Sequence, residues 1–320
     1  MIVDRTHNSR AGAVSALMAV AVMGIVLTAH SLVLAQGAQG TAQRTFATPE
    51  DAVRGLTEAV KAGNIDEMRA LFGPGGQELI ASSDEATSRR NREVFTVAAA
   101  EGWRLVDQGT NRKALIVGNE AWPFPVPLVK SGKSWRFDSA AGKEEVLARR
   151  IGRNELAVIG ICRAMVAAQH RYAQQGHDGK PVGLFASTVR SDPGKQNGLY
   201  WPAAPGQPRS PLGDLVAQAW EEGRPIGTER GTPFHGYYFR GLTAQGAAAP
   251  GGAKSYVVNG ELSAGFALVA WPAQYDASGI MTFIVNQDGA VHEKDLGAKT
   301  DATVAAMTAY NPDASWHRVQ

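Results

Sequence analysis

The chain has 320 residues, of which 44% are apolar and 19% are charged, and its formal net charge is +2 at pH 7. A chain of this length and apolar content can form two domains of ordinary size, each with a buried core. The near-neutral charge and the lack of basic runs interleaved with aromatic residues exclude the electrostatic surface that a nucleic-acid partner requires.

The N-terminal segment has the pattern of an export signal. Basic side chains and one histidine precede the apolar run of residues 11–29: Arg5, His7 and Arg10. Val33 and Ala35 occupy the positions of small residues before a signal-peptidase site. We therefore predict a signal peptide over residues 1–35, cleavage after Ala35, and a periplasmic or secreted protein. The apolar run is also long enough to span a bilayer, so the alternative is an uncleaved segment that anchors the protein. Only in that case would the protein be associated with the membrane.

The next residues change from a spacer to a helical pattern. Residues 36–47 are mostly Gly, Ala, Gln and Thr, which predicts a disordered spacer. Thr48 then suits a helix N-cap and Pro49 the first helical position. Three helical segments precede four short strand-like segments in residues 48–141, which predicts an α+β domain with an antiparallel sheet. This order resembles that of small NTF2-like domains, which implies a curved sheet around a cone-shaped pocket.

Residues 142–300 have the pattern of a second α+β domain. One long helix is expected from about residue 143 to residue 175, followed by an irregular Gly- and Pro-rich segment and then by β-rich segments. Asn259-Gly260 is typical of a type I′ hairpin turn. The continuous apolar segment "GFALVAWP" predicts a central strand that is buried on both faces. Residues 301–320 are expected to form a C-terminal tail.

Two groups of residues are candidates for binding a ligand. Arg149, Arg150 and Arg153 cluster on the long helix and could hold a phosphate, although such a run is more often a solvated face or an inter-domain salt bridge. The irregular segment carries aromatic residues that are expected to be exposed: Tyr200, Trp201 and Trp220. A long irregular segment is often functional.

The acidic stretch "MTFIVNQDGAVHEKDLG" tests whether the chain has a metal or catalytic site. Placing Gly289 at the sixth position of a calcium loop puts Ile284, an apolar residue, at the first ligand position, so the pattern fails. His292 has no second His or Cys at a zinc-ligand spacing. Asp288-Gly289 instead predicts a hairpin turn between two strands. We predict no metal, no cofactor and no catalytic residue from this stretch.

The single cysteine, Cys162, excludes an internal disulfide. It lies in the apolar helical stretch "LAVIGICRAMV", which predicts a small buried side chain rather than a nucleophile.

Several longer motifs resemble those of a bacterial family of exported proteins that is identified as domain of unknown function 2950. They are "WPFPVPLVK", "WRFD", "GKEEVLARRIGRNEL", "GYYFRGLTAQG", "GFALVAWPAQY" and "GIMTFIVNQDGAVHEKDLG". The resemblance covers residues 46–297 and implies no activity and no catalytic residue. The region from Asn154 onward also resembles pilin-like and pseudopilin-like globular domains, which implies one long helix on an antiparallel sheet. Because a whole domain precedes that helix, we do not expect the chain to polymerise as pilins do.

These observations leave three hypotheses about function. The first is a non-catalytic envelope protein that binds a protein partner or assists an assembly. The second is a periplasmic binder of a small molecule or glycan that uses the NTF2-like pocket or the aromatic residues. The third is a hydrolase with residues that are distant in the sequence, for which the candidate acids are Glu120, Asp192 and Asp214.

Overall fold

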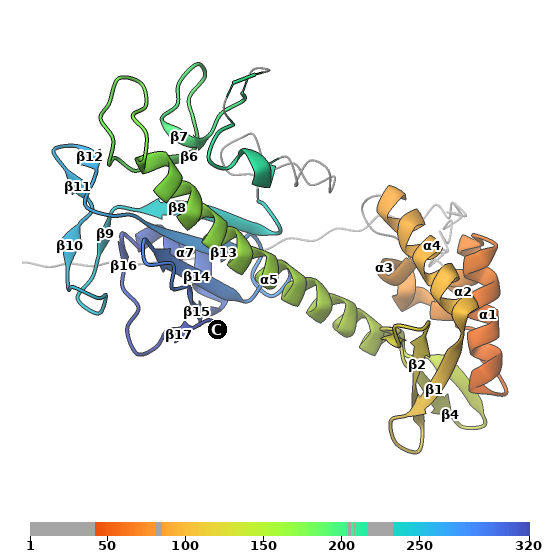
Figure 1. Cartoon of the computed structure of the whole chain (residues 1–320). Helices are drawn as coiled ribbons and strands as arrows, with labels where there is room; N and C mark the ends of the chain where they lie inside the picture. The colour runs from red at the N-terminus through yellow and green to blue at the C-terminus, as the bar shows by residue number, and fades with distance from the viewer. Residues whose placement is uncertain (1–41, 81–84, 204–205, 208, 217–232) are drawn as a thin grey trace, which may run out of the picture. The chain divides into compact units, whose positions relative to one another are not determined.

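The computed structural model confirms the α+β class. It describes most of the chain after the N-terminal segment: residues 42–80, 85–203, 206–207, 209–216 and 233–320. Helices and several antiparallel sheets alternate along these residues (Figure 1). The predicted signal peptide and the first residues of the predicted spacer lie outside the described residues.

The first helices begin and end where the sequence indicates. The N-terminal helices are α1 (Pro49–Lys61), α2 (Ile65–Phe72), η1 (Pro74–Gly76), α3 (Gln77–Ile80) and α4 (Glu85–Glu101). The Thr48 hydroxyl accepts a hydrogen bond from the Asp51 backbone N–H at 3.1 Å, which confirms the predicted N-cap. Gly73 follows α2 with a φ of 68°, a conformation that glycine adopts at no steric cost.

One antiparallel sheet packs with these helices. Its strands are β1 (Trp103–Asp107), β2 (Arg112–Val117), β3 (Trp122–Pro123), β4 (Leu128–Ser131) and β5 (Ser134–Phe137). They are ordered β1-β2-β4-β5, and β3 pairs with β2. The side chains of Leu56, Leu71, Leu115 and Phe137 are fully buried between helices and sheet. We call this cluster the N-terminal core.

The end of the predicted spacer differs from the expectation, because residues 42–47 are held against the N-terminal core. Phe46 and Trp135 exchange two backbone hydrogen bonds of 2.8 Å each. The Gln43 side-chain amide donates to the Leu71 and Phe137 carbonyls at 3.0 and 2.7 Å. The composition of the segment did not indicate this order. Two residues, Phe46 and Gln43, make the contacts that hold it, and two residues change the overall composition little.

Helix α5 (Ser139–Ala173) is the predicted long helix and begins a few residues earlier than expected. Asp138 caps its start by accepting the Ala141 N–H at 3.3 Å. Near its start, the Ser139 hydroxyl donates to the Phe72 carbonyl at 2.6 Å. Further along, Cys162 is fully buried and burial raises the pKa of its thiol to about 12, which confirms the predicted small buried side chain.

A second antiparallel sheet follows the helix. Its strands are β8 (Tyr237–Leu242), β13 (Ala267–Pro272), β14 (Met281–Asn286), β15 (His292–Asp295) and β17 (His317–Arg318), in the order β17-β15-β14-β13-β8. Helix α5 packs on one face through Val158 and Met165, and helix α7 (Thr300–Ala306) packs on the other through Val304. Strand β13 therefore lies between two strands and two layers, which confirms the prediction from "GFALVAWP" and explains its continuous apolar sequence.

Shorter elements complete this part of the chain. They are β6 (Thr188–Arg190), β7 (Gly198–Tyr200), β9 (Ala244–Gln245), β10 (Lys254–Ser255), β11 (Val257–Val258), β12 (Glu261–Leu262), η2 (Gly297–Lys299) and β16 (Ala309–Tyr310). Asn259 and Gly260 join β11 to β12 with φ values of 52° and 81°, as the predicted type I′ turn requires. The segment expected to be a tail contains α7, β16 and β17, because buried side chains such as Tyr310 anchor it.

Among the residues that the structure describes, no helix has both the length and the apolarity to cross a membrane.

Candidate functional site

The acidic stretch of residues 281–297 forms the predicted hairpin. Strands β14 and β15 pair antiparallel, and the Gly289 N–H donates to the Asn286 carbonyl at 3.0 Å with a Gly289 φ of 77°. The Asn286 side-chain amide donates to the Asp288 carboxylate at 2.9 Å, so this carboxylate stabilises the loop. Among the residues that the structure describes, no three His, Cys, Asp or Glu side chains lie close enough to share a metal ion.

His292 of this hairpin faces a buried tyrosine and gives a testable pH dependence. Its Nδ1 lies 3.2 Å from the Tyr310 hydroxyl, and burial, aided by the charge of Arg318, lowers the pKa of His292 below its ordinary value of 6.5. Below pH 6.5 the unfolded chain therefore binds more protons at this residue, and the stability that is fully present above pH 6.5 falls as the pH falls. We expect His292→Gln to lose less stability than the unsubstituted chain between pH 7.5 and pH 5.5 in urea denaturation. Equal losses in the two proteins would contradict this.

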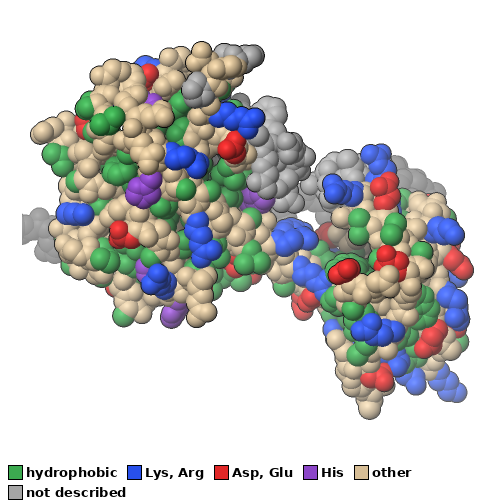
Figure 2. Space-filling model, viewed as in Figure 1, with side chains coloured by type: hydrophobic (Ala, Val, Ile, Leu, Met, Phe, Trp, Pro, Cys, Tyr) green, Lys and Arg blue, Asp and Glu red, His purple; other side chains and the backbone are tan. Residues whose placement is uncertain are grey.

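The predicted arginine cluster is only partly available for a ligand. The Arg149 guanidinium donates to Glu145 and to the Pro123 carbonyl, at 2.8 Å each, and lies 5.7 Å from the centre of the Trp122 ring. Arg150 and Arg153 are exposed, and no ion pair joins them to another described residue. Figure 2 shows Lys and Arg side chains beside Asp and Glu side chains across the face in view. The phosphate role of the cluster remains a prediction.

The predicted aromatic residues are less exposed than expected. Tyr200 and Trp201 are half-buried and pack against the core between α5 and the second sheet. Trp220 lies outside the described residues. No hydrogen bond, ion pair or ring contact within the described parts joins the arginine cluster to Tyr200 or Trp201, so the structure does not bring the two predicted groups together.

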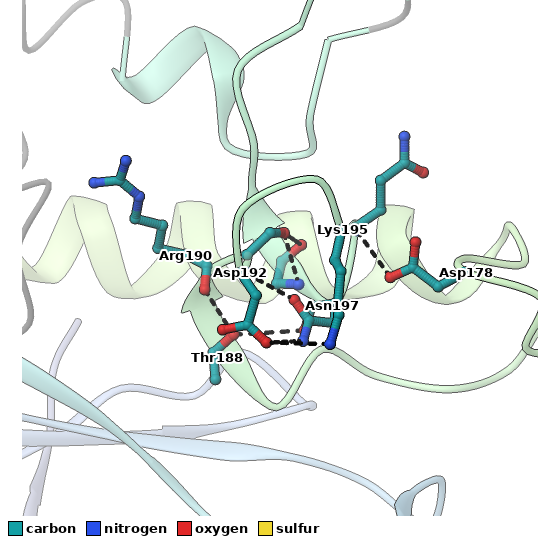
Figure 3. Close-up of polar contacts among 9 residues, drawn as sticks. Asp178, Thr188, Arg190, Asp192, Lys195 and Asn197 are labelled. Atoms are coloured by element: carbon teal, nitrogen blue, oxygen red, sulfur yellow. Dashed lines mark hydrogen bonds and ion pairs between the residues drawn. The ribbon is translucent and has the colours of Figure 1, made fainter.

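The candidate acids of the hydrolase hypothesis lie apart from one another. Glu120 is exposed in the turn after β2, and Asp214 forms an exposed ion pair with Arg209 at 2.7 Å. Asp192 belongs to a loop network, in which its carboxylate accepts from the Asn197 side-chain Nδ2 and its backbone N–H donates to the Asn197 side-chain Oδ1, both at 2.9 Å (Figure 3). Lys195 adds an ion pair with Asp192 at 3.8 Å. These contacts make Asp192 a structural residue of the loop between β6 and β7.

This loop contributes Asn197 to the lining of a cleft at the C-terminal end of α5. Tyr172, in the last turn of the helix, stacks on His177 with ring centroids 4.0 Å apart. The Tyr172 hydroxyl donates to the Gln196 carbonyl at 2.8 Å. The Gln196 backbone N–H donates to an Asp178 carboxylate oxygen at 2.8 Å, which is the dashed line that ends at Asp178 in Figure 3. The ring of Trp201 meets that of His177 edge to face at 5.5 Å. Trp201 therefore packs on His177, which lines the cleft, while Trp201 itself does not.

Two tight turns frame the opening of the cleft. Asp178 and Gly179 have φ values of 50° and 77°, so the chain turns sharply after His177. The hairpin tip at Asn259-Gly260 approaches this turn, and the Lys180 ammonium pairs with both oxygens of Glu261 at 2.9 and 3.1 Å. The ion pair joins two segments that are 81 residues apart in the sequence.

The cleft combines an apolar lining with polar groups. Its volume is about 160 Å³, and Leu184, Phe185 and Leu262 contribute apolar surface. The Phe185 N–H donates to the Leu262 carbonyl at 2.8 Å, which fixes the two residues beside each other. Burial, and then the Asp178 and Glu261 carboxylates, raise the pKa of Tyr172 to about 12, so its hydroxyl stays protonated at neutral pH.

Sequence reasoning missed the charged residues of the cleft. Asp178 and Lys180 are near neighbours in the sequence, but Lys180 lies 81 residues before Glu261, and the three residues share no motif. One signal was available, because Asp178-Gly179 is the same type of turn dipeptide as Asp288-Gly289. It predicts a turn at that position, but not the residues that face it.

Comparison with known proteins places the chain in a family. No curated protein matches the chain, and no solved structure matches it, so the resemblances to NTF2-like and pilin-like domains remain predictions. The family model described as "Protein of unknown function (DUF2950)" matches residues 43–319. That match covers nearly all of the fold described above, and the chain belongs to the DUF2950 family.

Proposed function

We propose that this protein is a non-catalytic binding module and that the cleft beside the end of α5 is its ligand site. The observation that supports this proposal is the cleft itself, a concave surface that is already formed and that combines apolar side chains with hydrogen-bonding groups. Such a combination is typical of sites for small ligands. The volume of about 160 Å³ is below that of drug-sized sites, so the cleft takes one ring or one side group of a ligand.

The structure therefore favours the small-ligand hypothesis for this part of the chain, with different residues from those expected. Tyr200 and Trp201 act indirectly, because Trp201 supports His177 and neither residue lines the cleft. The ligand instead meets Phe185, Lys180 and Glu261.

The test is a fragment screen by NMR that follows the amide signals of the cleft. We expect fragments to shift the signals of residues such as Lys180 and Gly260. Ser187 lines the cleft and is exposed, so Ser187→Trp should fill the space and lower the affinity of each such fragment by about tenfold or more. Ser131→Trp, at an exposed position at the end of β4, is the matched control and should leave the affinities unchanged. Fragments that bind elsewhere, or an affinity that Ser187→Trp leaves unchanged, would contradict the proposal.

We also propose that the protein is exported to the periplasm or secreted. The pattern of Arg5, Arg10, the apolar run and the small residues before position 36 supports export and cleavage after Ala35. Cell fractionation followed by N-terminal sequencing should find the chain outside the cytoplasm with Gln36 as its first residue. An intact chain in the cytoplasm would contradict both parts of this proposal.

A second candidate function, contact with an envelope protein or assembly, is favoured by an apolar pair on α4. Val94 and Val97 are 62% and 63% exposed and lie on one side of the helix. We expect in-cell crosslinking to capture an envelope component and the double substitution of both valines by Ser to reduce that capture. Val258→Ser, at another exposed valine, is the control. Capture that is unchanged by the double substitution would exclude α4 as the contact surface.

A further inference from the structure

The lining of the cleft has more carboxylate groups than ammonium groups. Its charged side chains are Asp178, Lys180 and Glu261, of which Lys180 and Glu261 pair with each other. Asp178 is exposed, and its Oδ2 accepts the Gln196 N–H. Its Oδ1 has no hydrogen bond to another described residue. The cleft thus has one carboxylate that its own lysine does not neutralise.

Tyr172 also lines the cleft, near both carboxylates. The pKa of Tyr172 is raised to about 12, mainly by burial and, to a smaller extent, by the Asp178 and Glu261 carboxylates. Both carboxylates therefore act on the same point from two different segments of the chain. A group that enters the cleft meets the Asp178 carboxylate and, beside it, the Lys180–Glu261 ion pair.

The remaining lining suits the flat, apolar side of a ring. Phe185 is half-buried and its ring packs on that of Phe266 at 4.8 Å, so it is fixed in place. Leu262 and Leu184 lie beside it in the lining. A hydroxylated ring can place its C–H groups on this surface while its polar substituents reach the carboxylates.

Resting on the proposed function of the cleft, we infer that it binds a hydroxylated ring carrying an ammonium group, of the amino-sugar class, in preference to a neutral or acidic ring of the same size. An ammonium group gains a charge-assisted hydrogen bond to Asp178 Oδ1, which is stronger than a bond between neutral groups. A carboxylate at the same place meets Asp178 and is repelled. Hydroxyl groups can bond to the Lys180–Glu261 pair at the rim.

The test uses three probes of nearly equal shape that differ in charge: glucosamine, glucose and glucuronate. With the full chain at low ionic strength, we expect calorimetric titration to rank glucosamine first, about tenfold tighter than glucose, and glucuronate last. Raising the salt concentration should reduce the difference between glucosamine and glucose.

The substitution Asp178→Asn removes the negative charge of this side chain and leaves the turn intact. Asn tolerates the φ of 50° at this position and keeps an oxygen that accepts the Gln196 N–H, so the turn is retained. The glucosamine affinity should fall about tenfold, to that of glucose, whose own affinity should be unchanged. Glu120→Gln removes a carboxylate from an exposed turn outside the cleft and should change neither affinity.

Equal affinities for the three probes, a preference for glucuronate, or a preference for glucosamine that survives in Asp178→Asn would each overturn the inference. If the cleft then binds neutral or acidic fragments in the NMR screen, the proposed function stands without the preference for an ammonium group. If no fragment of any charge shifts the cleft signals, both the proposed function and the inference fail.

Discussion

Gly279→Ala is expected to be strongly destabilising, by about 3 kcal/mol in the free energy of unfolding. A Cβ atom at this position would lie 2.0 Å from the Tyr237 hydroxyl oxygen and 2.4 Å from its ring carbon Cζ. Tyr237 cannot move aside, because it is fully buried and its hydroxyl donates to the Met281 carbonyl at 2.9 Å. Urea denaturation of the purified variant measures the change.

The control for this prediction is the same substitution in open space. Gly160 lies in helix α5, where a Cβ atom would meet nothing within 4 Å. Gly160→Ala should therefore raise the stability by about 0.5–1 kcal/mol, since alanine has the higher helix propensity. Finding that Gly279→Ala changes stability by less than about 0.5 kcal/mol, the range of ordinary surface substitutions, would refute the assigned contact with Tyr237.

Glu155→Ala is expected to cost about 2–3 kcal/mol for a different reason, the loss of a shared acceptor. The Glu155 carboxylate oxygen Oε1 accepts the backbone N–H groups of Ile280 and Met281 at 2.9 and 3.0 Å, and the Tyr237 hydroxyl lies 3.4 Å away. These bonds join the middle of α5 to the start of β14. Alanine leaves two half-buried donors without this acceptor, and water must replace it.

The adjacent residue on the helix provides the comparison. Leu156 is 73% exposed, so its side chain contributes little to the core. Leu156→Ala should therefore change the stability by less than about 0.5 kcal/mol. Hydrogen exchange gives a second measurement, because Glu155→Ala should speed exchange at Ile280 and Met281 more than at the centre of β13. Unchanged exchange at these two amides would argue against the bonds.

Elements with a strong local cause were predictable from the sequence. The cap at Thr48, the type I′ turn at Asn259-Gly260 and the long helix each depend on residues within a few positions, and the structure contains all three. The buried strand β13 was predictable because burial on both faces requires continuous apolar sequence. The ordered segment around Phe46 was not, since its partner Trp135 lies far along the chain.

The candidate site depends almost wholly on distant residues, which explains why its prediction was incomplete. Glu261 follows a predicted turn, but its partner Lys180 precedes it by 81 residues, and only the folded chain brings them together. The aromatic residues were expected to be exposed because the segment around Trp201 has little periodicity. Irregular backbone can still direct side chains into a core, as it does for Trp201.

Helix α5 has a consequence for any experiment that divides the protein. Domain boundaries usually fall in exposed linkers that can be cut without loss. Here the boundary expected from the sequence, between residues 141 and 142, falls inside a continuous helix that begins at Ser139. The start of this helix contacts residues that precede it, and its later turns contact the second sheet. A fragment that ends at residue 141 keeps the cap at Asp138 but loses the turns that make the helix stable, because short helices are marginal by themselves. Each half must therefore be produced with its own copy of the helix turns that it contacts.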